Sequence, residues 1–243
     1  MHTRTFDLAT ADGPMPCYEA VPDRSGETAR GAVLVFQEAF GVNPHIEDVT
    51  RRFADAGYHA VAPALYHRTG SPTFGYDEFS KLGEHFTAIT DAGILADTDA
   101  VLDYFHQAGW ADGRIGTVGF CMGGRATFVV AGHRTLGAAV GFYGGRIVTG
   151  GPDGSGSLLG LIPTLATPWL GLFGDEDKGI PVEDVERLRT ELEAAPVDTE
   201  IVRYAGAEHG FHCDARPSYH REAAADGWAR TLSWLDAHLA KAG

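Results

Sequence analysis

A cysteine between two glycines has the most clearly defined chemistry in this sequence. Gly119-Phe120-Cys121-Met122-Gly123 has the form G-x-S-x-G, with Cys in place of Ser. In a nucleophile elbow of this form, the nucleophile stands on a tight turn between a strand and a helix, where only small neighbours fit. The helix N-terminus then favours negative charge on the thiolate. The pattern predicts Cys121 as a nucleophile, and the alternative is a structural cysteine beside a Gly-rich turn.

An acid and a base are expected after the elbow, in that order along the chain. Asp177 follows a short apolar run and is the predicted acid, with Asp175 as the alternative. His209 follows the next such run and is the predicted base, with His212 as the alternative. His209 would take the thiol proton and return it to the leaving oxygen, while Asp177 orients the imidazole. Taken singly, each acid is better explained as a residue that solvates a turn or caps a helix.

Two backbone amides should complete such a site as an oxyanion hole. The amide of Met122, directly after the nucleophile, is the first donor. The second should come from the loop that follows the apolar run 31–36, where Gln37-Glu38-Ala39-Phe40-Gly41 stand. These donors would stabilise the negative charge that develops on a carbonyl oxygen.

The elements that must position these residues alternate along the chain. Strands are predicted at 31–36, 58–62, 114–119, 137–142, 168–173 and 199–204, and helices at 46–56, 90–107, 126–131, 182–194 and 219–240. This alternation predicts an α/β fold, with a mostly parallel sheet and helices on both faces, in one domain over residues 1–243. Right-handed crossovers place the loops after the strands along one edge. Loops are expected at 67–76 and 144–167, and the longer one either shapes the active site or runs over the surface.

Composition limits the classes of partner, cofactor and cellular location that we expect for this protein. Lys and Arg number 19 and Asp and Glu 33, a net charge of −14 that argues against nucleic acid. Cys17, Cys121 and Cys213 form no CxxC pair, so neither a disulfide framework nor structural zinc is predicted. No apolar signal core and no membrane-length run are present. We therefore expect a cytoplasmic protein that acts without metal or cofactor, as a monomer or small homo-oligomer.

Six segments together resemble the dienelactone hydrolase family, and they occur in family order from about residue 30 onward. They are 37–43 (QEAFGVN), 62–66 (APALY), 118–124 (VGFCMGG), 142–144 (FYG), 174–177 (GDED) and 208–211 (EHGF). The resemblance implies an α/β-hydrolase fold and hydrolysis of a small lactone or ester. It also implies that Glu38 lies beside the catalytic thiol and receives its proton when substrate binds, and that Ala39 supplies the second oxyanion amide.

The resemblance is weaker where that family holds a substrate carboxylate with two arginines. The position four residues after the histidine is Cys213 here, with Arg216 nearby as a substitute. For the second arginine the chain offers Lys81 or Arg68. Tyr143 would either face the pocket or pack in the core.

Two other functions remain open from the sequence. The same scaffold could carry a thioesterase or acyl transferase, because a fold does not dictate a substrate. A non-catalytic binding module or thiol sensor would use Cys121 as an oxidisable group. A complete set of nucleophile, base and acid argues for an enzyme.

Overall fold

One eight-stranded sheet forms the centre of the molecule, in the order β1-β2-β4-β3-β5-β6-β7-β8. The computed structural model describes residues 1–23, 29–151, 154 and 156–240. Strands β3 to β8 run parallel, whereas β2 pairs antiparallel with both β1 and β4. The predicted mostly parallel sheet is confirmed.

The bounds of the elements lie close to those expected. The strands are β1 (His2–Thr10), β2 (Gly13–Val21), β3 (Gly31–Phe36), β4 (Tyr58–Pro63), β5 (Ile115–Phe120), β6 (Ala138–Phe142), β7 (Trp169–Gly174) and β8 (Thr199–Tyr204). The α-helices are α1 (Pro44–Asp55), α2 (Gly83–Thr87), α3 (Asp91–Gln107), α4 (Met122–His133), α5 (Val182–Glu191) and α6 (Arg221–His238). Short 3-10 turns occupy η1 (His67–Thr69), η2 (Phe79–Lys81), η3 (Asp112–Arg114), η4 (Leu158–Thr164) and η5 (Leu192–Ala194).

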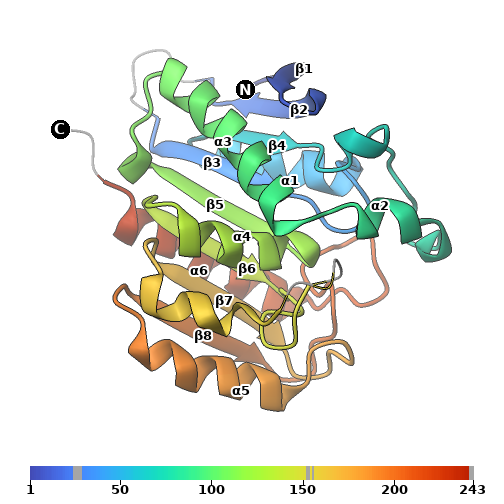
Figure 1. Ribbon diagram of the computed structural model, residues 1–243, viewed down its shortest axis with the longest axis vertical. Coiled ribbons are helices and arrows are strands. Elements are labelled where there is room, and N and C mark those ends of the chain that lie inside the picture. Colours follow the sequence, from blue (N-terminus) through green and yellow to red (C-terminus); the bar gives the residue numbers. More distant parts are fainter. Residues whose placement is uncertain (24–28, 152–153, 155, 241–243) are drawn as a thin grey trace.

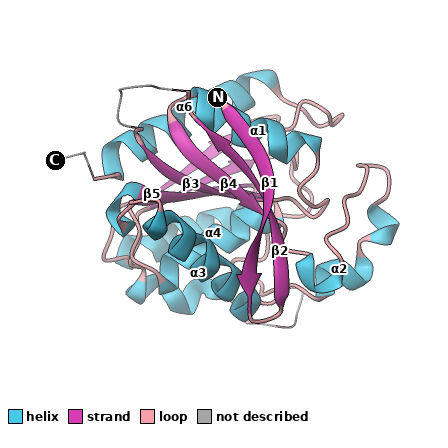
Figure 2. Cartoon of the chain, turned by 90° about the horizontal axis from the view of Figure 1, so that it is seen from above, coloured by secondary structure: helices cyan, strands magenta, loops and turns pink. Residues whose placement is uncertain are grey.

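Helices cover both faces of the sheet, as predicted. Figure 1 shows α3, α4 and α5 in front of the sheet and α6 behind it, and Figure 2 shows α1 and α6 together on one side with α3 and α4 on the other. Strands β3 to β7 are buried along their whole length, which is why they read as continuous apolar runs. Helix α4 is also buried over most of its length, at the centre of its layer.

Strand register brings the predicted site residues to one edge. Phe36 at the end of β3 pairs with Gly119 on β5, and Phe120 at the end of β5 pairs with Phe142 at the end of β6. Gly174 on β7 pairs in the same way with Tyr204 on β8. Because parallel strands end together, the loops that follow them meet at this carboxyl edge.

The N-terminal hairpin was not predicted. Strand β1 is the sheet edge and mostly exposed, so it carries no apolar run. Strand β2 contains Pro14 and Pro16, and proline argues against a strand when only the sequence is available. Helix α4 begins four residues earlier than the predicted helix 126–131, directly after Cys121.

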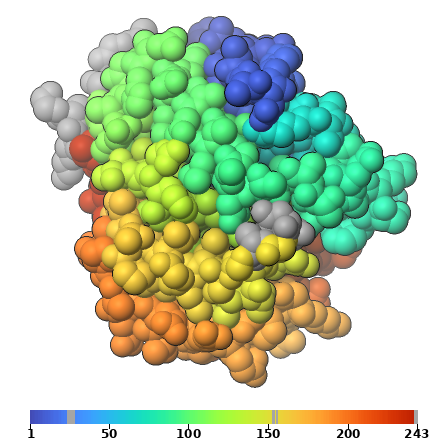
Figure 3. Space-filling model, in the orientation of Figure 1, coloured from blue at the N-terminus to red at the C-terminus, as the bar shows by residue number. Residues whose placement is uncertain are grey.

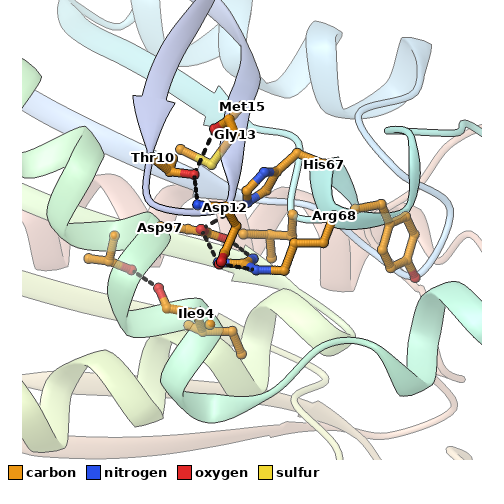
Figure 4. A network of polar contacts seen from close by, with 12 residues as sticks. Thr10, Asp12, Gly13, Met15, His67, Arg68, Ile94 and Asp97 are labelled. Carbon is orange, nitrogen blue, oxygen red and sulfur yellow. Dashed lines mark hydrogen bonds and ion pairs between the residues drawn. The ribbon is translucent and has the colours of Figure 1, made fainter.

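A buried polar network ties this hairpin to the helical layer (Figure 4). The Asp97 carboxylate accepts from Arg68 at 2.8 and 2.9 Å and contacts His67 Nε2 at 3.1 Å. Arg68 also donates to Asp12 at 2.7 Å, in the turn between β1 and β2. Asp97 and His67 are buried side chains, 1% and 0% exposed. The network therefore fixes the start of the long segment between β4 and α3.

That segment carries α2, which stands out from the body of the molecule beyond the sheet's carboxyl edge (Figures 1 and 3). No helix within the described residues is long and apolar enough to cross a membrane.

Candidate active site

Cys121 stands on a strained turn between β5 and α4. Its backbone angles are φ 55° and ψ −116°, a conformation that non-glycine residues rarely adopt. Two hydrogen bonds fix the turn to its neighbours: Cys121 N donates to Phe142 O at 3.0 Å, and Gly123 N donates to Gln37 O at 3.1 Å. The strand-turn-helix geometry expected of a nucleophile elbow is present.

The flanking glycines are required by packing. A Cβ on Gly119 would lie 2.1 Å from the Gly123 carbonyl oxygen, and a Cβ on Gly123 would lie 2.5 Å from the Phe36 carbonyl oxygen. A Cβ on Gly124 would lie 2.4 Å from the Phe142 oxygen. Any side chain at these positions would push α4 away from the sheet and move the sulfur.

Asp177 and His209 come together with Cys121 at this edge. Asp177 Oδ2 lies 2.6 Å from His209 Nδ1, and its other oxygen accepts from Gly179 N at 2.8 Å. The Asp177 side chain is 1% exposed, whereas His209 is 31% exposed. The carboxylate is thus held by one backbone amide and one imidazole, with no lysine or arginine among its hydrogen-bond partners in the described part of the chain.

The surroundings of His209 favour its protonated form. Burial lowers the pKa of His209. Negative charge on Cys121 and hydrogen bonds with Asp177 and Cys121 raise it by more than burial lowers it, so the net pKa is about 10. A protonated His209 can donate its proton to a bound molecule.

The two alternative residues lie elsewhere. Asp175 accepts from Arg203 at 2.7 Å and does not contact the imidazole. His212 is 2% exposed, and its ring lies 5.1 Å from Phe120 and 5.0 Å from Phe142, centroid to centroid. Burial lowers the pKa of His212 to about 3, so this ring is a neutral core residue.

Glu38 lies on the loop after β3 and is completely buried. Its Oε1 accepts from Arg216 Nη1 at 3.2 Å, while Oε2 has no hydrogen-bond partner among the described residues. Arg216 lines the adjacent pocket and Glu38 does not, so the arginine connects the carboxylate with the pocket. A buried carboxylate oxygen without a hydrogen-bond partner lowers the stability of the fold, which favours a functional reason for Glu38 at this position.

Met122 and Ala39, the predicted oxyanion residues, both line the pocket. Met122 is the first residue of α4, where an amide has no acceptor within its own helix. The Ala39 carbonyl accepts from the Tyr66 hydroxyl at 2.8 Å, which fixes this peptide. Sequence reasoning missed Tyr66 as a positioning residue, although it ends the segment 62–66.

A pocket of about 730 Å³ opens beside Cys121 and His209, a size that suits a small molecule. One wall is apolar and comes from η2, α2 and the residues after them: Phe79, Leu82, Phe86, Ile89 and Ile94. Cationic side chains also line it, namely Arg125, Arg146, Lys178 and Arg216, together with the acids Glu176, Asp177 and Glu208. Only Arg216 among these cations was predicted, because the others come from three separate segments.

The remaining predicted substrate residues do not line the pocket. Lys81 is 64% exposed and pairs with Glu78. Arg68 belongs to the buried network described above. Tyr143 is completely buried, with its ring centroid 5.1 Å from that of His209. Of the two interpretations offered for Tyr143, packing in the core matches its position.

Comparison with known proteins identifies relatives over nearly the whole chain. The profile of the "Dienelactone hydrolase family" matches residues 15–239. A "Putative carboxymethylenebutenolidase" of Salmonella typhimurium is 40% identical over 230 residues, which is 94% of this chain and 85% of that protein. A "Probable 2-oxo-3-(5-oxofuran-2-ylidene)propanoate lactonase" of Bradyrhizobium sp. is 30% identical over 236 residues, covering 96% and 93%.

A solved structure agrees with these relatives. The "Putative Dienelactone Hydrolase" of Klebsiella pneumoniae subsp. pneumoniae is 37% identical and superposes with a TM-score of 0.87, covering 96% of this chain and 98% of that one. The α/β-hydrolase fold expected from the sequence is thereby confirmed.

Proposed function

Because the chain belongs to the dienelactone hydrolase family, we propose that it hydrolyses a small lactone or ester through a Cys121–His209–Asp177 triad and an acyl-enzyme intermediate. The observation that carries this proposal is the convergence of a strained cysteine, an imidazole and a buried carboxylate at the mouth of one pocket. A binding module has no need of the last two groups.

In the first half-reaction, the Cys121 thiolate attacks the substrate carbonyl carbon. The carbonyl oxygen becomes negatively charged and accepts hydrogen bonds from the amides of Met122 and Ala39. The bond between carbon and the leaving oxygen then breaks, and the His209 imidazolium donates its proton to that oxygen. In a lactone, the leaving oxygen stays attached to the acyl chain as a hydroxyl group.

In the second half-reaction, neutral His209 removes a proton from water. The resulting hydroxide attacks the thioester carbon, the carbon–sulfur bond breaks, and the product acid leaves. Asp177 keeps the imidazole in the orientation that both transfers require. The second half-reaction ends with a thiolate and an imidazolium, the pair from which the first half-reaction starts in the substrate complex.

Glu38 and Arg216 make the triad responsive to the substrate. A substrate carboxylate entering the pocket would compete for Arg216 and release Glu38 from its hydrogen bond at 3.2 Å. The freed carboxylate could then accept the Cys121 proton, which would form the thiolate only when substrate is bound. This role is supported by the burial of Glu38 and by its unpaired oxygen.

The test is a panel of small lactones, aryl esters and acyl thioesters, with and without a carboxylate. We expect hydrolysis of lactones or esters by the natural protein, near-background rates for Cys121→Ala and strong impairment of Cys121→Ser, because a serine hydroxyl has a much higher pKa. Cys17→Ala is the matched control, since Cys17 lies in β2, away from the pocket.

Mass spectrometry of the reaction under turnover should detect the acyl group on Cys121. Near-normal turnover in Cys121→Ala would refute the proposal. A preference for thioesters would keep the triad and change the substrate class.

A further inference from the structure

A second group of potential ligands lies behind the pocket. Side-chain atoms of Glu38, His45 and Cys213 converge, and one ligand atom from each lies within 4.8 Å of the others. The three come from the loop after β3, the start of α1 and the loop between β8 and α6. All three residues are buried. In residues 1–23, 29–151, 154 and 156–240, no other trio of His, Cys, Asp or Glu residues converges this closely.

The polar atoms of this group are under-used by the protein itself. Within the described residues, Glu38 Oε2 and both ring nitrogens of His45 have no hydrogen-bond partner, although Glu38 is 0% and His45 6% exposed. The Cys213 sulfur donates a hydrogen bond to the Tyr76 hydroxyl at 3.1 Å. Buried polar atoms without partners need an explanation, and a buried carboxylate, imidazole and thiol that converge on one point fit a bound ion.

We propose that Glu38, His45 and Cys213 bind a zinc-like divalent cation. Thiolate and imidazole ligands select zinc over magnesium or calcium, which prefer oxygen. Zinc bond lengths of about 2.0–2.3 Å put neighbouring ligand atoms roughly 3.3–3.8 Å apart, so small side-chain rotations would close the site. Three protein ligands leave the fourth position to water.

The charges of the group suit a dication. The His45 ring is buried and neither nitrogen has a hydrogen-bond partner among the described residues, so one nitrogen can coordinate. The Cys213 thiol loses its proton to solvent when the ion binds. The thiolate and the Glu38 carboxylate bring two negative charges to the ion, and Arg216 stays on Glu38 Oε1, which leaves Oε2 for the ion. Asp214, which is 53% exposed and lies 3.9 Å from His45 Nδ1, marks the surface side of the site.

Binding would inhibit the enzyme, and this second part rests on the proposed function. An ion that holds Glu38 prevents this carboxylate from accepting the Cys121 proton. Zinc would therefore act from behind the pocket, without touching the triad or competing for the space that the substrate occupies.

Cobalt(II) tests the site directly, without any activity measurement. Cys121→Ala protein, freed of metal with a chelator, removes the competing thiol of the triad. We expect one equivalent of cobalt to give a sulfur-to-cobalt charge-transfer band, and Cys213→Ser or His45→Gln in the same background to weaken binding by at least about 10–100-fold. Cys17→Ala in that background is the control and should keep the band. Circular dichroism checks that each variant folds.

Absence of the band in Cys121→Ala protein, or its persistence in Cys213→Ser, would overturn the proposed site. For the inhibitory part, zinc should inhibit the natural enzyme reversibly, and at least about tenfold more zinc should be needed for Cys213→Ser. Equal sensitivity of the two proteins would place the inhibitory ion at the triad and refute this part. An enzyme inactive on the whole panel would count against the proposed function, while the cobalt result would still decide the site.

Discussion

Among the described residues, two completely or almost completely buried aspartate side chains, Asp97 and Asp177, each contact a histidine, and the two pairs differ in their surroundings. His67 contacts Asp97 at 3.1 Å, and His209 contacts Asp177 at 2.6 Å. Asp97 gives both oxygens to Arg68, whereas Asp177 accepts from the amide of Gly179 and from the imidazole. A carboxylate that already pairs with a guanidinium stabilises a neighbouring imidazolium less than an unpaired carboxylate does.

The second difference is what each imidazole can reach. The His67 side chain is 0% exposed, and its Nδ1 has no hydrogen-bond partner within the described residues. His209 is partly exposed, lines the pocket and contacts Cys121. The comparison teaches that the pair proposed as catalytic differs from the other in its third partner and in its access to the pocket.

Removing the catalytic imidazole should have the largest effect. We expect His209→Ala to lower kcat for the best ester or lactone by about 10⁴-fold or more, because the proton donor to the leaving oxygen is lost. Steady-state kinetics measure this, and His67→Ala is the matched variant. Comparable losses of kcat in the two folded variants would erase the distinction between the pairs.

Asp177→Asn should have a smaller effect, about 10²–10⁴-fold on kcat. It should also change the pH profile. The pKa of His209 is raised to about 10, so the imidazolium persists below that pH and is lost above it, and kcat/KM should fall on the alkaline side near pH 10. Because the substitution removes one cause of the raised pKa, the alkaline limb should move to lower pH. An unmoved limb would show that Asp177 does not support the imidazolium.

Asp97→Asn should act on stability instead. Removing this buried carboxylate leaves Arg68 with Asp12, which is 53% exposed, and costs about 3 kcal/mol in the free energy of unfolding. Urea unfolding gives this value, while kcat should change by only a few-fold. A large loss of kcat in the folded variant would mean that the network does more than hold the segment between β4 and α3.

Lys81→Ala should have the smallest effect. Its side chain is exposed, pairs with Glu78 and lies outside the pocket lining. We expect KM for a carboxylate-bearing ester to stay within about twofold, whereas Arg216→Ala should raise it clearly. An equal increase in KM for Lys81→Ala and Arg216→Ala would show that Lys81 contributes to substrate binding.

The sequence predicted the parts of this molecule whose chemistry is local. The elbow glycines, the runs that became β3 to β8 and the residues directly after those runs are each set by a few neighbours. Strands β1 and β2 were missed because one is an exposed edge and the other contains prolines. The Asp97 network and the pocket cations depend on contacts between segments far apart in the chain, so spacing gave no sign of them.

The projecting segment around α2 has a practical consequence for engineering. It supplies most of the apolar lining, while the sulfur, the imidazole and the carboxylate stand on the loops after β5, β8 and β7 at the carboxyl edge of the sheet. Libraries that exchange Phe79, Leu82 and Phe86 can therefore remodel acyl-group selectivity while the reacting atoms stay fixed. Diversity placed at Gly119 or Gly123 would instead yield mostly inactive clones.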